Sequence, residues 1–196
     1  MKSLFCCATL LIASLSGSEA HPEVPAPAKP LDLCGVSLSG AEFGKGKSPY
    51  PDAAEAKYFQ NQGMNLIRLP VLWERLQHQL DTPCDADEIK GLKKLVEEIT
   101  AQGQNVIIDV HNYARYQDQI IGSPEVPLSS FASFWKQLAT SFKDNPKVLF
   151  GLMNEPHTMK SETWLTAANA AIAAIRATGA KQTIFICGNG WSGAHS

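Results

Sequence analysis

The chain has 196 residues, a formal charge of −2, 44% hydrophobic residues and 18% charged residues. These values are typical of an ordinary globular protein and exclude an intrinsically disordered chain. They also exclude the strongly basic surface with which proteins bind nucleic acids. We therefore expect no nucleic-acid partner, and a ligand that is neither strongly acidic nor strongly basic.

Residues 1–20 have the pattern of a secretory signal peptide. Lys2 precedes an apolar run over residues 4–15, and the Ser-Glu-Ala of residues 18–20 fits a cleavage site. A membrane anchor is the alternative, but the run is shorter than the roughly 18 to 20 residues that span a bilayer. We expect cleavage near His21, a secreted, extracellular protein, and no contact with a membrane after cleavage.

Residues 21–32 are rich in proline, which favours an extended lead-in over packed structure. Beyond the signal the chain has Cys34, Cys84 and Cys187, an odd number for a compartment in which cysteines usually pair. Their pairing stays open at this point. The chain has no Cys-x-x-Cys spacing, so we expect no structural zinc site, and we expect no cofactor.

From residue 33 onward, short apolar runs alternate with amphipathic segments. The short runs predict buried strands, because helices normally need more length. These predicted strands cover residues 33–38, 65–69, 104–110, 148–153 and 183–187. The segments between them carry apolar residues at helical spacing on one face. These predicted helices cover residues 52–62, 89–99, 131–142 and 164–175.

Three of the predicted helices end at a glycine, namely Gly63, Gly103 and Gly179, and a strand begins shortly after each. Right-handed crossovers make such strands parallel and place the helices outside the sheet. The two candidate architectures are an open doubly wound sheet and a closed eight-stranded barrel. No Gly-x-Gly-x-x-Gly follows the first strand, so the dinucleotide-binding form of the open sheet is disfavoured.

Polar and aromatic residues follow the carboxyl end of every predicted strand, which is where α/β folds build their sites. In chain order these residues are Glu42, Arg68, His111 with Asn112, Asn154 with Glu155, and Asn189 with Trp191. The simpler alternative is a strand followed by a polar turn that caps the next helix. An arginine, a histidine and a carboxylate on successive strands favour an active site instead.

Adjacent residues on an ideal strand point to opposite faces. Asn154 and Glu155 can therefore face one cavity only if their strand ends there, which Pro156 encourages. Asp109 and His111 are two residues apart and share a face. We expect Asp109 to be structural and to bond the backbone of a neighbouring strand. The alternative for His111 is a hydrogen-bonded histidine in the core.

Five segments resemble glycoside hydrolase family 5, and most closely its endo-β-1,4-glucanases, the cellulases. These segments are Arg68-Leu69-Pro70, residues 73–77, residues 109–116, Asn154-Glu155-Pro156 and residues 188–195. The resemblance covers residues 33–196. It implies an α/β fold, a (β/α)8 TIM barrel of which about the first five strands and four helices are present. It also implies hydrolysis of a β-linked polysaccharide with retention of configuration.

The resemblance also implies roles for the residues at the strand ends. Glu155 matches the general acid/base, Asn154 the amide that binds the sugar 2-hydroxyl, Arg68 the arginine that keeps the nucleophile ionised, and His111 a substrate-site histidine. The chemistry agrees with these roles. A retaining glycosidase needs a carboxylic acid to protonate the leaving oxygen and an ionised carboxylate about 5 to 5.5 Å away. A nearby arginine keeps that second carboxylate charged.

Flat aromatic rings after the strands are candidates for stacking on sugar faces. Trp73, Tyr113 and Trp191 follow the second, third and fifth strands, and we assign them to substrate binding together with Asn112. Trp191 is the strongest candidate because glycines lie close to it on both sides. Trp73 has packing at the barrel rim as its alternative. Two further tryptophans fall on helical apolar stripes and are assigned to the core, Trp135 and Trp164.

The family pattern continues with a histidine and tyrosine pair, the nucleophilic glutamate and a stacking tryptophan, none of which occurs in these 196 residues. Five strands do not close a barrel, and complete barrels typically need about 250 residues. The strand over residues 183–187 would leave an apolar edge. We therefore expect an amino-terminal part of the enzyme that carries the acid/base, lacks the nucleophile and is inactive alone.

Two other functions compete with this one. The chain could be a non-catalytic glucan-binding protein that keeps the aromatic residues without the chemistry. It could also be a metal-dependent barrel hydrolase with His111, Glu155 and His157 as ligands, since two histidines and a carboxylate can hold a metal. The choice among cellulose, lichenan and mannan, and the oligomeric state, stay open.

Overall fold

The computed structural model describes residues 32–43 and 50–193. The signal peptide expected over residues 1–20 lies outside these ranges, as does almost all of the lead-in expected over residues 21–32. Within the described ranges, no helix combines the length and the apolar character that crossing a membrane requires.

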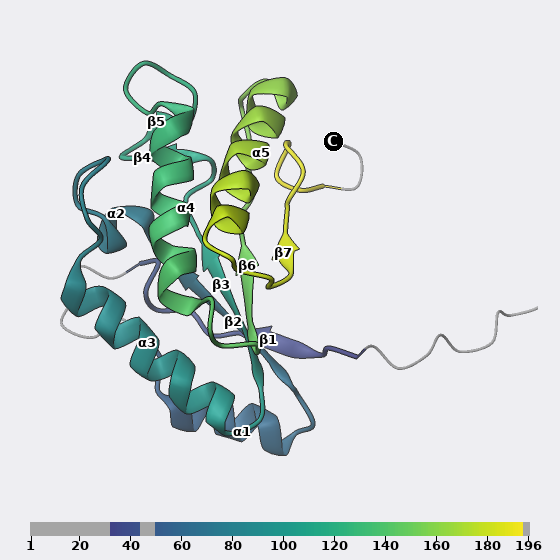
Figure 1. The fold of residues 1–196 in the computed structure, drawn as a ribbon. Coiled ribbons are helices and arrows are strands. Elements are labelled where there is room, and N and C mark those ends of the chain that lie inside the picture. Colours follow the sequence, from purple (N-terminus) through teal and green to yellow (C-terminus); the bar gives the residue numbers. More distant parts are fainter. Residues whose placement is uncertain (1–31, 44–49, 194–196) are drawn as a thin grey trace, which may run out of the picture. The chain divides into compact units, whose positions relative to one another are not determined.

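A sheet of five parallel strands forms the centre of the described fold (Figure 1). Its strands are β1 (Gly35–Ser37), β2 (Leu66–Val71), β3 (Asn105–Val110), β6 (Val148–Gly151) and β7 (Ile184–Phe185). The strands lie side by side in the order in which they occur in the chain. A doubly wound sheet would reverse its order part-way. The sequential order therefore favours the barrel over the open sheet.

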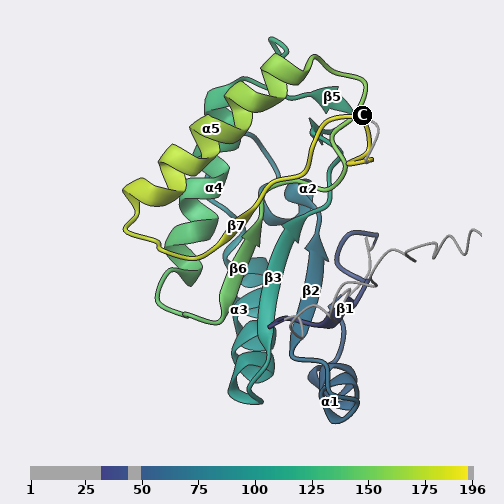
Figure 2. The same cartoon turned by 90° about the vertical axis from the view of Figure 1, so that its right-hand side faces the viewer.

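Helices follow each of the first four strands of this sheet. They are α1 (Ala53–Asn61), α3 (Ala86–Ala101), α4 (Leu128–Phe142) and α5 (Ser161–Ala177), with a short α2 (Trp73–Leu76) directly after β2. Figure 2 shows α3, α4 and α5 along the same face of the sheet. The predicted helix ends at Gly63, Gly103 and Gly179 are confirmed, since each glycine has a positive φ (88°, 105° and 85°) just after its helix.

Local capping explains where α1 and α3 begin. The carboxylate of Asp52 accepts a hydrogen bond from the backbone amide of Ala54. Asp85 accepts from the amides of Asp87 and Glu88 in the same way. Aspartate at this position satisfies amide groups that the first helical turn leaves without a partner.

Alternation along the strands separates the core from the site. In β2, Ile67, Leu69 and Val71 are buried, and Val106, Ile108 and Val110 are buried in β3, so these side chains form the core between sheet and helices. The intervening residues, which include Arg68 and Asp109, point to the opposite face. Trp135 and Trp164 are buried in this core, as predicted.

Two parts of the structure, comprising three elements, were not predicted. The first is α2, and the second is an antiparallel hairpin of β4 (Arg115–Tyr116) and β5 (Gln119–Ile120) after β3. Gln117 and Asp118 form its two-residue turn with φ of 46° and 65°. Such turns usually contain glycine or asparagine-glycine. Because Gln117 and Asp118 lack this signature, the sequence does not predict the hairpin.

Cys34, Cys84 and Cys187 are all unpaired in the described part of the chain.

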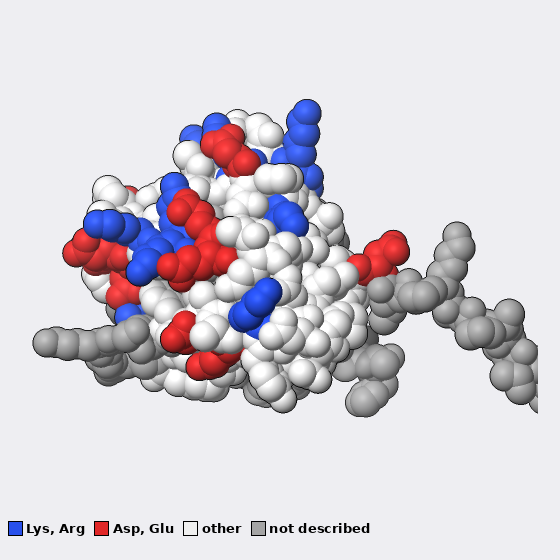
Figure 3. Space-filling model, turned by 90° about the horizontal axis from the view of Figure 1, so that it is seen from below, with Lys and Arg blue, Asp and Glu red and all other residues white. Residues whose placement is uncertain are grey.

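The surface has an apolar edge and a mixed charge pattern. Phe185 of β7 and the following Ile186 are exposed, as expected for an apolar edge strand. Seen from below, the surface carries Lys and Arg side chains interspersed with Asp and Glu (Figure 3).

Gly151 gives a test of how the sheet makes room for Asp109. A Cβ at Gly151 would lie 2.8 Å from Asp109 Oδ1 and 3.2 Å from Ile107 Cγ2. We expect Gly151→Ala to lower the free energy of unfolding by about 1–3 kcal/mol, because both neighbours are held in the sheet. Urea denaturation measures this. Gly188→Ala is the control, since a Cβ there meets nothing within 4 Å; equal losses in both variants would contradict the packing argument.

Candidate active site

The guanidinium of Arg68 joins three strands at the carboxyl end of the sheet. Its Nη2 donates to Asp109 Oδ2 at 2.7 Å and to Asn154 Oδ1 at 2.7 Å. Its Nη1 donates to Ser37 Oγ at 3.2 Å. Bonds from an ionised donor are stronger than those between neutral groups. Arg68 therefore fixes the relative positions of residues from β1, β3 and the segment after β6.

The register of the sheet explains why Arg68 reaches these partners. Pro70 of β2 pairs with Asp109 of β3, and Asp109 pairs with Gly151 of β6. Arg68 lies two residues before Pro70, so both side chains leave the same face of β2. The long arginine side chain runs along this face toward the strand ends. The absence of a side chain at Gly151 leaves space for the Asp109 carboxylate.

The backbone changes direction between Asn154 and Glu155. Strand β6 ends at Gly151, two residues before the predicted end, so Asn154 and Glu155 both lie beyond the strand. The amide of Asn154 still donates to the carbonyl of Val110 at 2.7 Å, which holds this segment beside β3. Glu155 then has a φ of +40°. A left-handed conformation in a residue other than glycine costs about 1–3 kcal/mol and is concentrated at functional sites.

His111 lies in the same cluster as Arg68. Its Nδ1 is 3.3 Å from Asp109 Oδ2 and 3.3 Å from Arg68 Nη2, and its Nε2 is 3.3 Å from the hydroxyl of Tyr113. Asp109 was expected to bond the backbone of a neighbouring strand, and this partner was wrong. Its carboxylate pairs with the Arg68 side chain instead. Since Asp109 is buried, the charge of Arg68 is what compensates its own.

Tyr113 and Trp191 form an aromatic rim next to His157, in the segment after β6. Their ring centroids are 6.0 Å apart at 62°, and Trp191 is 56% exposed. The amide of Trp191 donates to the carbonyl of Pro156 at 3.0 Å, so the segment after β7 is tied to the segment after β6. Asn189 contributes to the same loop, where its Nδ2 donates to the carbonyl of Met159.

The structure corrects the assignment of Trp73 to substrate binding. Trp73 is fully buried and packs against Tyr116, Phe131 and Phe134, with ring centroids 5.0 to 5.5 Å away. Its indole nitrogen donates to Gln77 Oε1 at 2.8 Å. A ring enclosed in this way presents no face to a sugar. The alternative, packing near the rim of the sheet, describes its position.

Asn112 also has a different role from the one expected. It is buried, its Oδ1 accepts from the backbone amide of Trp73 at 2.7 Å, and its Nδ2 donates to Glu74 Oε2 at 2.5 Å. Both ends of the amide are therefore bonded to α2. The structure thus places Asn112 as a link between β3 and α2.

Glu42, the candidate after the first strand, accepts a hydrogen bond from the amide of Gly40 after β1.

Two residues of the site were not recognised from the sequence as a pair. His157 stacks on Trp191 with ring centroids 3.6 Å apart and an interplanar angle of 6°. Arg115 Nη1 contacts His157 Nε2 at 3.1 Å and donates to the carbonyl of Tyr113 at 2.6 Å. Arg115 belongs to the 109–116 segment already singled out. Its position within the unpredicted hairpin is what concealed its contact with His157.

The metal-site alternative finds no geometric support. Among the residues that the structure describes, no group of three or more His, Cys, Asp or Glu side chains could hold a metal ion. His111, Glu155 and His157 therefore do not form the proposed ligand set.

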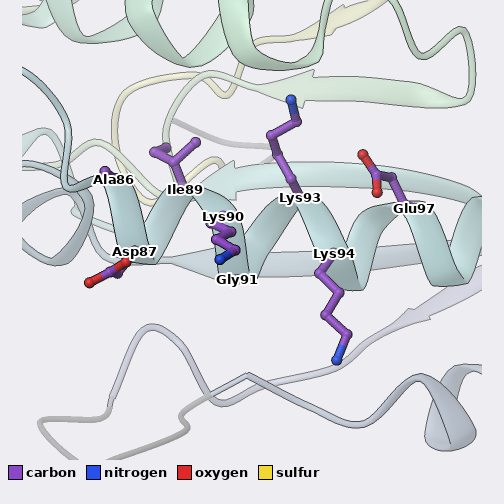
Figure 4. Close-up of a pocket in the computed structure, with 8 residues that line it drawn as sticks. All are labelled: Ala86, Asp87, Ile89, Lys90, Gly91, Lys93, Lys94 and Glu97. Atoms are coloured by element: carbon purple, nitrogen blue, oxygen red, sulfur yellow. The ribbon is translucent and has the colours of Figure 1, made fainter.

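A hollow of about 770 Å³ lies along α3 and is lined by residues of this helix alone. Charged residues line much of it: Asp87, Lys90, Lys93, Lys94 and Glu97. In Figure 4, the side chains of Lys93 and Lys94 extend to opposite sides of the helix. They do not converge on a common point, so this hollow is a solvated helix surface rather than a second site.

The Arg68–Asp109 pair gives a test of the site's organisation. In a double-mutant cycle of Arg68→Gln and Asp109→Asn, we expect a coupling energy of about 1–3 kcal/mol in the free energy of unfolding, because the pair is largely buried. The control cycle uses Lys94 and Glu98, an exposed pair 3.8 Å apart, for which about 0.3–0.5 kcal/mol is expected. Additive effects of the two Arg68 and Asp109 changes in urea denaturation would refute the arrangement.

Comparisons with known proteins agree with this geometry. A family model described as Cellulase (glycosyl hydrolase family 5) matches residues 24–196. Endoglucanase 1 of Saitozyma flava is 37% identical over 206 residues, which cover 100% of this chain and 59% of that relative. The chain thus spans little more than half of the length of this relative.

Solved structures show the same relation. The structure of XacCel5A in complex with cellopentaose is 45% identical with a TM-score of 0.79, and the match covers 84% of this chain and 55% of that one. Pseudomonas stutzeri endoglucanase Cel5A in complex with cellobiose is 44% identical with a TM-score of 0.77, covering 83% and 52%. The described sheet and helices are part of a (β/α)8 barrel. This chain belongs to the cellulase family, glycosyl hydrolase family 5.

Proposed function

We propose that this chain provides the acid/base half of the active site of a secreted, retaining endo-β-1,4-glucanase. The observation that carries the proposal is the 2.7 Å bond from Arg68 to Asn154 Oδ1. This bond holds the residue before Glu155 against the charged cluster at the strand ends. The family membership and the cellopentaose bound by the similar XacCel5A support a β-1,4-glucan as the substrate.

Glu155 is the proton donor in this proposal. Its carboxylic acid protonates the glycosidic oxygen as the bond to the sugar breaks, and the resulting carboxylate later accepts a proton from the water that releases the product. A donor must reach the leaving oxygen from the side of the substrate. Strand β6 ends before these residues and Glu155 has a left-handed backbone, and this break in the extended conformation would allow Asn154 and Glu155 to contact the same sugar.

Asn154 is placed to bind a sugar hydroxyl. An amide side chain has one acceptor oxygen and two N–H donors on its nitrogen. Because Oδ1 already accepts from Arg68, the orientation of the amide is set and Nδ2 points elsewhere. The remaining N–H groups are available to the 2-hydroxyl of the sugar. Arg68 thus prepares Asn154 as a donor, besides adding a positive charge that would favour ionisation of a neighbouring carboxylate.

The nucleophile is proposed to come from another part of the full enzyme. Other carboxylates of the described site region already have partners: Asp109 pairs with Arg68, Glu42 accepts from Gly40, and Glu74 accepts from Asn112. A nucleophile must also be open to the sugar, whereas Asp109 and Glu42 are buried and both oxygens of Glu74 accept hydrogen bonds, from Asn112 and from the amide of Gln117. The limited coverage of the relatives is consistent with this division of the site.

We expect the 196-residue chain alone to release no reducing sugar from carboxymethylcellulose and no aglycone from aryl cellobiosides, because a single carboxylate cannot complete the double displacement. Reducing-sugar and chromogenic assays measure this, with Glu155→Gln as the matched variant. Turnover by the unmodified chain that disappears in Glu155→Gln would show that an internal carboxylate acts as the nucleophile.

We also expect the chain to be cleaved and secreted. Produced in a host with a secretory pathway, it should appear in the medium with an amino terminus near His21, as measured by amino-terminal sequencing and intact mass. The proline-rich lead-in would then precede a catalytic domain that we place from residue 33, although the family match starts at residue 24. An intracellular product that retains Met1 would contradict the signal-peptide proposal.

A further inference from the structure

The stacked pair of His157 and Trp191 sets the position of one candidate sugar platform. The rings lie 3.6 Å apart and almost parallel at 6°, so His157 covers one face of the indole. Trp191 nevertheless remains 56% exposed. One face of the indole is supported by protein, and the rest of the ring is open to a ligand.

Arg115 contacts both the imidazole ring and the backbone carbonyl of His157. Its Nη1 is 3.1 Å from His157 Nε2, and its Nη2 donates to the His157 carbonyl at 3.4 Å. The same Nη1 donates to the carbonyl of Tyr113 at 2.6 Å. One guanidinium therefore links the segments after β3 and β6, and the stack extends this link to the segment after β7.

These contacts select one protonation state of His157. An arginine has only donors, so Nε2 must accept the hydrogen bond and carry no proton. The ring proton then lies on Nδ1, which is 2.8 Å from Thr158 Oγ1 and can donate to it. This is the neutral imidazole with a defined tautomer. Protonation of Nε2 would remove the bond to Arg115 and place two cations against each other.

We propose that His157, held by Arg115, is a positioning residue that supports Trp191 as a sugar platform only while its imidazole is neutral. The identity of the sugar rests on the proposed glucanase function. The support of the Trp191 ring by His157 does not depend on that function. The charged groups that face His157 are Arg115 on β4 and Glu155 on its own segment. Tyr113 faces it with ring centroids 6.0 Å apart.

The balance of these charges gives the direction of the pH effect. Partial burial and the charge of Arg115 lower the pKa of His157 below its ordinary value, and Glu155 opposes them with a smaller effect. The imidazole is therefore neutral and the platform supported near pH 7. The pKa of His157 lies below about 6.5, the ordinary value for histidine. As the pH falls through this lowered pKa, the imidazole gains a proton and the support of Trp191 is lost.

Collisional quenching of tryptophan fluorescence by acrylamide tests the support in the full chain. Trp73, Trp135 and Trp164 are buried, so the difference between wild type and Trp191→Phe isolates the signal of Trp191. We expect the quenching constant of Trp191 to rise by up to about twofold at low pH, because one of two ring faces becomes uncovered. It should stay high at every pH in His157→Ala. In His157→Phe, which keeps a flat ring that cannot titrate, it should stay low.

Two results would overturn the proposal. The first is an equal pH dependence in wild type and His157→Phe. The second is the same quenching constant in wild type and His157→Ala at pH 7.5. Circular dichroism of each variant establishes that the fold is intact, and Arg115→Gln provides a second variant, which should raise the quenching constant near pH 7 without removing the ring. No change in Arg115→Gln would exclude the role of Arg115.

Binding of cellopentaose separates the support from the glucanase function. By calorimetry we expect His157→Ala to weaken binding at pH 7.5 by about 2- to 10-fold, the range for one aromatic contact, and His157→Phe to restore part of this loss. Unchanged affinity in His157→Ala would overturn the platform role. Cellopentaose binding is also measured for a longer form that carries the rest of the barrel. If neither this form nor the chain binds cellopentaose, the proposed function fails. The support of Trp191 by His157 still stands in that case, provided that the quenching results are as expected.

Discussion

The hydrogen bonds of the Arg68 guanidinium are the interaction on which the site depends. A buried carboxylate such as Asp109 is costly without a compensating charge, and the arginine supplies that charge together with a fixed geometry. The same group orients the amide of Asn154 and lies beside the ring of His111. Removal of Arg68 would therefore leave the buried charge of Asp109 without its arginine partner. It would also remove the group that contacts Asp109, Asn154 and His111 together.

The sheet makes this arrangement possible through features that have no chemical role. Sequential parallel strands bring their carboxyl ends to one edge, and the alternation along each strand assigns apolar residues to the helices and polar ones to the opposite face. Gly151 leaves the space that Asp109 occupies. Asn112 connects β3 to α2 with both ends of its amide, so it stabilises the short helix that carries Trp73 into the core.

Most of the fold and the cluster of Arg68, His111 and Asn154 at the strand ends could be predicted from the sequence, because they depend on local patterns. Apolar runs, helical spacing and the glycines after helices indicated the strands and helices of the barrel, and the polar residues at the strand ends indicated Arg68, His111, Asn154 and Glu155. Trp73 was misassigned because its spacing after β2 does not reveal that α2 turns the ring into the core. The pair of Arg115 and His157 was missed because the two residues meet only through a hairpin whose turn lacks the usual glycine.

Residues other than glycine with positive φ gather in the loops that follow the strands. They include Tyr113 and Ala114 after β3, Glu155 and Thr158 after β6, and Trp191 and Ser192 after β7. A β-branched side chain is strained in this conformation, and Thr158 is the one such residue among these six. Substitutions to valine or isoleucine at these positions carry a backbone penalty even where the side chain is free of contacts. Tolerance to substitution is consequently lower at these loop positions than the exposure of their side chains alone would suggest.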